Sequence, residues 1–510
     1  MGVKNRFKAN HQTVIAIKIF LTCWIIYSLH FATNIVREHY PAFTIAEHGT
    51  LQVDEYLGFH PDIFKHTNNH AYINNNVGVS LIGAIPLIIF DPVLDKLEEI
   101  GKTKARELAA QQKLDTTYRT KYPLRQKFYK MVKERGLDLR FGASAALTSV
   151  LVMAPASALL VVLIFQLFIS KGLTSSRAIW YSLLFAFGTP IFFRTAYLNH
   201  NMFVMYSAFL SFYFLRKIID SGTEYSRSHL FLSGIFAGFT IFFDYSGVVP
   251  ILVLYGYLVY SFHQIKPIGE SVKISIPFIL GAIPPVLLLL YTQWVMFGNP
   301  FLPAQYWMPA VNYTDRGWRG FDLPSLDLYY LNLFGNDYGM FSFGPILLLA
   351  FFPKKKSTSL IISSQERGFI LTFFVLFVTF CAANQYSRMQ FNTGFRFLAP
   401  LVPFLFLMSC DFFNRLSDKW LMILTIPAML HSWVLSMERE PVIESWSQFL
   451  HEGIMFPWLR VLKLTHPPDH PILSSPFLPL SILILVGFLI YAIWKIKKLP
   501  LLEAPVENEK

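Results

Sequence analysis

Acidic, basic and amide side chains crowd one segment of the chain, between residues 50 and 76. Asp54 and Glu55 come first, Lys65 follows, and Asn74 and Asn75 close the segment. A carboxylate in partly apolar surroundings can remove a proton from a hydroxyl, while a nearby cation holds a departing phosphate. The sequence therefore predicts Asp54, with Glu55 beside it, as a catalytic base, although an ordinary solvated acidic pair has the same spacing.

The same segment contains histidines that could bind a metal. His66 and His70 are four residues apart, and His60 and Asp62 lie close by. Histidine and carboxylate ligands suit zinc. However, Pro61 and the nearby run of asparagines disfavour a helix that would present the histidines together. The pattern therefore favours a polar loop, and we predict no metal site and no cofactor; the use of a divalent cation stays open.

Further polar residues recur near the ends of later apolar stretches. They are the run from Arg194 to His200, Asp244, Tyr245, Gln293, Asn336, Asp337, Tyr338, Gln385, Tyr386, Arg388 and Arg396. Ionisable groups at membrane depth are costly and are therefore functional candidates, although groups at the end of a span can also reach the interface. If these residues share one face with Asp54, they could line a substrate cavity in which arginine grips the phosphate of a membrane lipid.

The elements that would position these residues are membrane-spanning helices. Of 510 residues, 54% are hydrophobic and 15% are charged, against about 25% charged in an average soluble chain. The charges are clustered, and the stretches between them approach the ~20 residues that cross a bilayer as a helix. We predict an all-α integral membrane protein of about twelve helices. Their expected starts are near residues 13, 144, 178, 201, 229, 247, 274, 341, 368, 397, 419 and 476.

Basic residues in short loops set the orientation. Arg216, Lys217, Lys266 and Arg415 fall in loops on the same side as the two basic tails. Because lysine and arginine mark the cytoplasmic side, both termini are expected there. Three longer segments then face outward, at 37–143, 298–340 and 438–475. We expect one polytopic domain over 1–510, with 37–143 as its large first extracytoplasmic loop.

Two parts of that first loop are expected at the membrane surface. Leu124, Phe128 and Met131 share one face of a helix surrounded by basic residues, which is typical of an interfacial helix; a solvated charged helix is the alternative. The apolar run 77–90 is short and contains Pro86. A run of this length is expected to be interfacial or re-entrant rather than spanning.

Other classes of protein are disfavoured by composition and by motifs. The net charge of +12 lies mostly in loops between apolar stretches, so it gives no signal of nucleic-acid binding. The three cysteines fall in or beside apolar stretches and offer neither a disulfide framework nor zinc spacing. The sequence contains no phosphate-binding loop, dinucleotide fingerprint or common hydrolase motif, which argues against a nucleotide-driven pump.

Several segments, in order, resemble one family. They are TNIVREHYPAFTIAEHGTLQVDEY, YINNNVGVSLIGAIP, FGTPIFFRTAYLNHNMF, AGFTIFFDYSG, GAIPPVLLLLYTQWVMFGNPF and GFRFLAPLVPFLFL. In these segments the chain resembles the GT-C superfamily of membrane glycosyltransferases, in particular the bacterial protein O-mannosyltransferase-like and aminoarabinose transferase-like proteins. The resemblance covers about residues 30 to 415.

The resemblance implies an inverting glycosyltransferase that uses a polyprenyl-phosphate sugar donor. The acceptor would be a lipid, a glycan or a protein, and the work would be done at the periplasmic or lumenal face, with a bacterial inner membrane favoured over the endoplasmic reticulum. Asp54 matches the acidic position of the family's first loop and Arg396 matches a late arginine expected at the donor phosphate. Arg388 and Lys65 are further expected phosphate contacts.

The chain departs from the family at one position, and other functions are open. Asn74 and Asn75 stand where the family usually has Asp and Lys, so the role of that lysine would pass to Lys65 or Arg396. The alternative function is a transporter or lipid flippase, but the sequence lacks the paired, interrupted helices of two related halves. A non-catalytic membrane scaffold is a third possibility.

Overall fold

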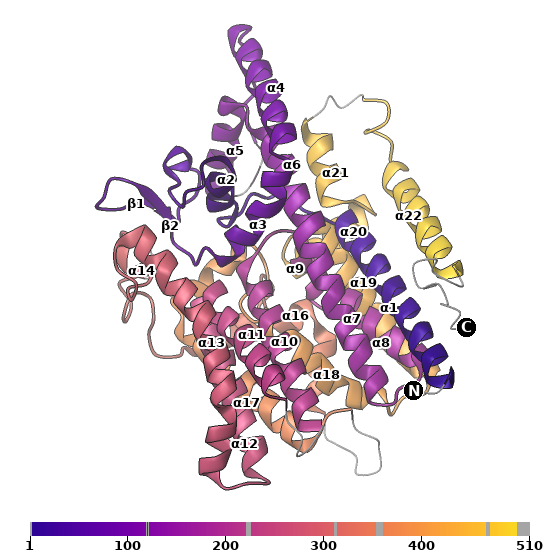
Figure 1. Cartoon of the computed structure of the whole chain (residues 1–510). Helices are drawn as coiled ribbons and strands as arrows, with labels where there is room; N and C mark the ends of the chain where they lie inside the picture. The colour runs from indigo at the N-terminus through magenta and orange to yellow at the C-terminus, as the bar shows by residue number, and fades with distance from the viewer. Residues whose placement is uncertain are drawn as a thin grey trace, which may run out of the picture.

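The computed structural model is almost entirely helical (Figure 1). It describes residues 3–118, 120, 122–220, 226–310, 314–352, 361–465 and 470–496. Within these ranges the strands are two short ones, β1 (Ile63–Lys65) and β2 (Ala71–Ile73), which pair antiparallel with Phe64 opposite Tyr72. The expectation of an all-α protein with apolar spans is confirmed at this level.

Eight helical stretches of the described chain are long and apolar enough to cross a membrane. They belong to α1 (Val3–Leu29), α6 (Asp138–Thr148) continued by η2 (Ser149–Met153) and α7 (Ala154–Ser170), α10 (His200–Asp220), η3 (Tyr245–Gly247) with α12 (Val248–His263), α13 (Ile268–Phe297), α17 (Ser364–Ala383), α19 (Asp418–Glu438) and α22 (Leu478–Lys495). This set of long apolar helices is that of a multi-pass membrane protein.

The expected number of twelve spans exceeds the number of long helices. At the other four expected positions the structure has shorter helices, α8 (Ser175–Gly188), α11 (Arg227–Phe243), α16 (Met340–Phe343) with η4 (Pro345–Phe351), and η6 (Ala399–Leu401) with α18 (Val402–Phe413). Glycine and proline explain several of these breaks. The helix α8 ends at Gly188 before Pro190, and Gly344 separates α16 from η4, which begins at Pro345. Irregular backbone at such depth is tolerated where protein buries it.

Residues 39–135 form a separate layer at one end of the helix bundle (Figure 1). We call it the loop layer. It contains α2 (His39–His48), η1 (Asp54–Tyr56), the β1–β2 hairpin, α3 (Gly78–Ile89), α4 (Asp91–Ala110) and α5 (Pro123–Arg135). Its core is aromatic and continues into the following span, as the ring of Phe43 stacks on that of Phe141 at 5.2 Å. The large first loop is therefore folded rather than extended.

The two segments expected at the membrane surface are helices of the loop layer. The run 77–90 forms α3, which bends by 81° into the charged helix α4. The pair would count as a ninth span only if both helices crossed together. In α5, Val132 is buried and Phe128 packs on the core of the layer, whereas Leu124 is exposed. The apolar face of α5 thus packs largely against the rest of the loop layer.

Glycines bring α11 and α13 into backbone contact. A Cβ atom built on Gly234 would lie 2.0 Å from the carbonyl oxygen of Phe278, and one on Gly281 would lie 2.1 Å from that of Phe231. Gly238 meets Ala282 in the same way. Small residues spaced by four let membrane helices approach closely, where dispersion and weak hydrogen bonds hold them. This pair fixes the end of α11, and therefore Asp244, against the bundle.

The C-terminal part of the described chain lies along one side of the bundle, near α1 (Figure 1). It comprises α20 (Val442–Glu452), α21 (Pro457–Thr465) and α22, while the earlier connections contain α9 (Ile191–Thr195), α14 (Ala304–Trp307), α15 (Leu326–Phe334) and η5 (Gln385–Asn392). The last helix, α22, lies at the edge beside α1 (Figure 1). It buries only Pro479 within the described chain, and hydrogen bonds from Lys18 and Trp494 join the two helices.

Candidate functional site

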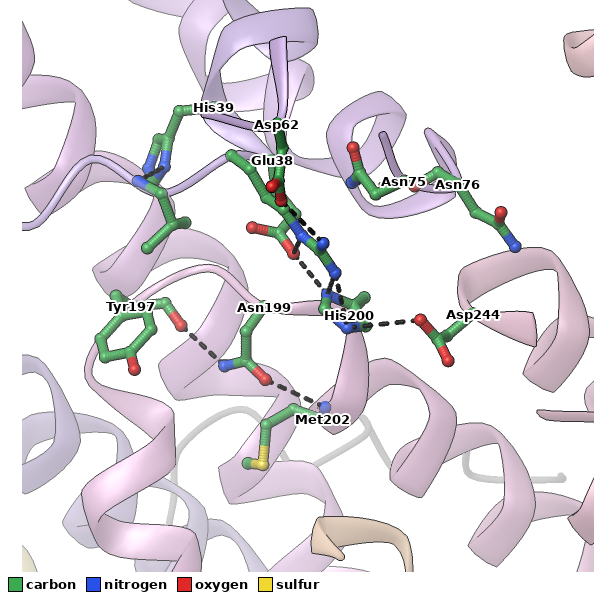
Figure 2. Close-up of polar contacts among 12 residues, drawn as sticks. Glu38, His39, Asp62, Asn75, Asn76, Tyr197, Asn199, His200, Met202 and Asp244 are labelled. Carbon is green, nitrogen blue, oxygen red and sulfur yellow. Dashed lines mark hydrogen bonds and ion pairs between the residues drawn. The ribbon is translucent and has the colours of Figure 1, made fainter. Parts of the chain in front are cut away.

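A cluster of opposite charges, partly buried, lies between the loop layer and the bundle (Figure 2). Arg37 follows α1 and donates to Asp62 at 3.0 Å. Arg37 also lies 3.1 Å from Nε2 of His200, the first residue of α10. Nδ1 of His200 contacts the Glu38 carboxylate, and its Nε2 lies 3.4 Å from Asp244. We call these five residues the acid–histidine cluster.

The charges of the cluster keep its carboxylates ionised. Burial alone would raise the pKa of the Glu38 carboxyl, but the hydrogen bond with His200 and the charge of Arg37 outweigh it, so the pKa lies below its ordinary value. Burial also opposes ionisation of Asp62, and there the charges of His60 and Arg37 bring the pKa below its ordinary value. Both groups are therefore proton acceptors at neutral pH.

Three consecutive asparagines lie beside this cluster. Asn74, Asn75 and Asn76 are almost fully buried, and Arg37 reaches the backbone oxygen of Asn74 at 3.4 Å. The side-chain amide oxygens of all three have no hydrogen-bond donor within the described protein. Since buried polar groups are nearly always paired, three unpaired acceptors in a row are suited to a ligand that brings hydroxyl donors.

Arginines dominate the adjoining part of the interior. Arg194 on α9 donates to the Tyr197 hydroxyl and to the Thr393 carbonyl. Arg439, which follows α19, donates to the Phe193 carbonyl at 2.8 Å and lies 4.8 Å from the Tyr197 ring centre. Arg396, which lies between η5 and η6, adds a third charge to this group. We call Arg194, Arg396 and Arg439, grouped around Tyr197, the arginine cluster.

Arg396 joins the two clusters electrostatically. Burial lowers its pKa to about 10, and the neighbouring charges of Arg37 and Arg194 act in the same direction. Asp62 is close enough to oppose this effect. One buried polar tract thus has carboxylates and a histidine in one half and arginines in the other. Such a separation suits a reaction in which one group accepts a proton while another stabilises developing negative charge.

The sequence predicted several members of this tract. His200, Asp244, Asn74 and Asn75 lie in or beside the acid–histidine cluster, and Arg396 adjoins it. Tyr386 is partly buried within electrostatic range of Asp62. The hydroxyl of Tyr245 is instead hydrogen-bonded to the Gln293 amide at 2.8 Å, next to Asp244. Asp337 lines a small hollow on the arginine side, together with Arg125 and Arg439.

Four predicted site residues lie outside the tract. Asp54 is half exposed and is held by His70, 2.8 Å away, and by the Ala71 amide. Burial alone would raise its pKa, but the hydrogen bonds from His70 and Ala71 outweigh this, so the pKa lies below its ordinary value. Glu55 is exposed beside His48, Lys65 is exposed at the end of β1, and Arg388 forms an ion pair with Asp327 at 2.5 Å.

The histidines considered as metal ligands point to different partners. The ring of His66 packs edge-on against Trp307, whereas His70 contacts Asp54. Within the described ranges, one other trio brings ligand atoms within 4.8 Å of one another, namely Glu47, His48 and Glu55. Two of its members are exposed and Arg140 already binds Glu47. We therefore assign no metal site to this trio.

Sequence reasoning missed Arg37, Glu38 and Arg439 and gave Asp62 no role beyond a weak metal pattern. A signal for the first pair existed, because adjacent opposite charges directly follow an apolar span at the end where Asp54 lies. Arg439 had no comparable signal. No family model, curated protein or solved structure matches the chain.

Proposed function

We propose that the protein is a glycosyltransferase that moves a sugar from a polyprenyl-phosphate donor to an acceptor hydroxyl at the outer membrane face. The observation that carries the proposal is the tract in which the acid–histidine cluster adjoins the arginine cluster. The order of motifs shared with GT-C enzymes supports the same class. The proposal includes cytoplasmic termini and about twelve spans, which the basic short loops support.

Asp62 is the proposed base, in preference to Asp54. Its carboxylate is ionised, partly buried and close to Arg396, whereas Asp54 is engaged by the hairpin outside the tract. The acceptor oxygen would attack the anomeric carbon as its proton passes to Asp62. The bond from that carbon to the phosphate oxygen breaks, and the electron pair leaves with the phosphate. Arg396 and Arg37 would stabilise the departing charge.

The unpaired amide oxygens of Asn74, Asn75 and Asn76 would accept hydrogen bonds from the sugar. At the first two of these positions, the GT-C enzymes that the chain resembles usually have Asp and Lys. Amide acceptors rather than a lysine in this position favour contact with the sugar hydroxyls over contact with the phosphate. The lipid part of the donor would lie in the membrane beside the helix ends.

A matched pair of variants tests the proposal. Transfer of radiolabel from polyprenyl-phosphate sugars would be measured in proteoliposomes with Asp62→Asn and Asp54→Asn. We expect Asp62→Asn to lose about 100-fold or more of the transfer rate, and Asp54→Asn to stay within a few-fold of the parent. Thermal unfolding midpoints would confirm that both variants are folded.

Other outcomes have distinct meanings. Loss of transfer in Asp54→Asn alone would return the base to the position predicted from the sequence. Transfer that survives both changes would remove both carboxylates from the chemistry. If the folded parent transfers label from none of the donors, the glycosyltransferase proposal fails, and uptake or lipid-scrambling assays on the same vesicles would test the transporter alternative.

A further inference from the structure

The arginine cluster holds more positive charge than the protein neutralises. Arg194 is 1% exposed and is among the largest fully buried side chains of the described chain. Within the described ranges, none of Arg194, Arg396 and Arg439 forms a direct ion pair with a carboxylate. Asp62 acts on Arg396 only through its charge, and Asp337 and Glu440 line a hollow together with Arg439. A buried, uncompensated charge is costly, and a protein normally pairs it.

Other buried arginines of the described chain show the usual arrangement. Arg140 contacts the carboxylates of Glu47 and Glu98. Arg216 contacts Glu366 at 2.7 Å. Arg194 is as deeply buried as these two, yet its contacts are a phenol, a backbone carbonyl and the face of an aromatic ring. Arg194 thus lacks the direct carboxylate partner that Arg140 and Arg216 have, and this leaves room for an anion from outside the protein.

Donor atoms remain available there. The Nε groups of Arg194 and Arg396 are buried and have no hydrogen-bond acceptor. The excess positive charge also lowers the pKa of the Tyr197 phenol. Burial alone would raise this pKa, but Arg194, Arg439 and Arg396 together outweigh the effect of burial. Figure 2 shows Tyr197 on the opposite side of Asn199 from His200, so this cationic region is a neighbour of the acid–histidine cluster and not a part of it.

We propose that Arg194 and Arg439, with Tyr197, form a second phosphate subsite next to the one at Arg396 and Arg37, so that the tract binds two phosphate groups at once. The inference rests on the proposed function for the role of the first phosphate. Several guanidinium groups that converge without a direct ion pair to a carboxylate match the charge and the multiple acceptor oxygens of a phosphate. The two phosphates belong either to one diphosphate-linked donor or to a monophosphate-linked donor and a phosphorylated acceptor.

Binding of simple anions tests the subsite without any transfer reaction. Inorganic phosphate and pyrophosphate would be titrated into the purified full-length protein in nanodiscs by calorimetry. We expect pyrophosphate to bind on the order of tenfold or more tightly than phosphate. Arg439→Gln should abolish that preference and Arg439→Lys should restore part of it. Equal affinities of the parent for the two anions, or a preference unchanged in Arg439→Gln, would overturn the subsite.

A matched control arginine lies at the opposite end of α8 from α9. Arg177 is half buried and pairs with Asp418 at 2.9 Å. Arg177→Gln should keep the pyrophosphate preference of the parent. If it lost the preference to the same extent as Arg439→Gln, the binding would be a response to net charge, and the subsite would be rejected.

Kinetics then identify the source of the second phosphate. A higher KM of Arg439→Gln for a diphosphate-linked donor, with no change for a monophosphate-linked one, assigns the subsite to the donor. A higher KM for a phosphorylated acceptor, with a monophosphate-linked donor, assigns it to the acceptor. No change in either KM would overturn the subsite even if pyrophosphate binds. If no donor supports transfer, the proposed function has failed, whereas the anion titration still decides the subsite.

Discussion

At the scale of single residues, Glu38 links the stability of the tract to pH. Its carboxylate contacts His200 and lies 3.6 Å from Arg37, and its side chain is almost inaccessible to solvent. Because its pKa is lowered in the folded protein, folding favours its ionised form. The stability that it contributes is present above its ordinary pKa of 4.5 and is lost as pH falls through the lower folded value.

Glu38→Gln should therefore remove part of the acid sensitivity of the fold. We expect the variant to be less stable than the parent at pH 7, by about 3 kcal/mol, because the change leaves the buried His200 and the partly buried Arg37 without this partner. The difference between variant and parent should shrink as pH falls below 4.5. Unfolding midpoints measured in detergent from pH 3 to 7 check this. A constant difference over that range would show that Glu38 does not titrate as described.

Sequence reasoning found the segment that contains the acidic residues and predicted Asp54 as the base, whereas we propose Asp62. The two differ in their local backbone. Asp54 opens η1 and is captured by the β1–β2 hairpin, whereas Asp62 precedes β1 and faces Arg37. The hairpin depends on the pairing of Phe64 with Tyr72, a contact that neither charge pattern nor hydropathy encodes. His200 and Asp244 were found because they follow or end apolar spans.

At the scale of elements, the α11–α13 contact makes a sharp prediction. Gly234→Val would drive its side chain into the Phe278 carbonyl, 2.0 Å from the new Cβ. We expect a loss of about 1–3 kcal/mol and a displacement of Asp244, with a lower transfer rate. Gly256→Val on α12 is the matched control, since nothing lies within 4 Å of its Cβ position. Equal unfolding midpoints of the two variants would contradict close packing at Gly234.

The positions of the apolar helices were predictable, and the lengths of four of them were not. Hydropathy finds α8, α11, α18 and the α16–η4 region because their side chains are apolar. It does not show where the backbone stops being helical. That depends on breaks such as Gly344–Pro345 and on the neighbouring helices that bury the irregular segments. These segments include η5 and η6, which flank Arg396 and so position the arginine cluster.

At the scale of the whole molecule, α13 runs from one end of the bundle to the other. Its 30 residues correspond to about 45 Å of helix. Ile265 precedes it and is 62% exposed, whereas Leu323 lies in the segment after it and is 81% exposed. The native cysteines Cys23, Cys381 and Cys410 are buried. Labelling of single cysteines introduced at positions 265 and 323 would therefore be measured against little labelling of the native cysteines.

We expect Leu323→Cys to react with a membrane-impermeant thiol reagent on intact cells, and Ile265→Cys only after permeabilisation. The reason is that basic loops, including the one with Lys266, are retained in the cytoplasm. The reverse pattern would invert the proposed orientation. Labelling of both positions from the same side would show that α13 does not cross. Labelling of the parent protein serves as the control, because it shows how far the reagent reacts with the native cysteines.

The peripheral position of α22 has a consequence for biosynthesis. This helix is the last apolar segment of the described chain to leave the ribosome, and it buries only Pro479 against the rest of the protein. Its insertion is therefore governed by the partition of its side chains between translocon and lipid, not by docking to helices already in place. A chain that terminates before α22 would still carry the complete charged tract, assembled from segments that have already entered the bilayer.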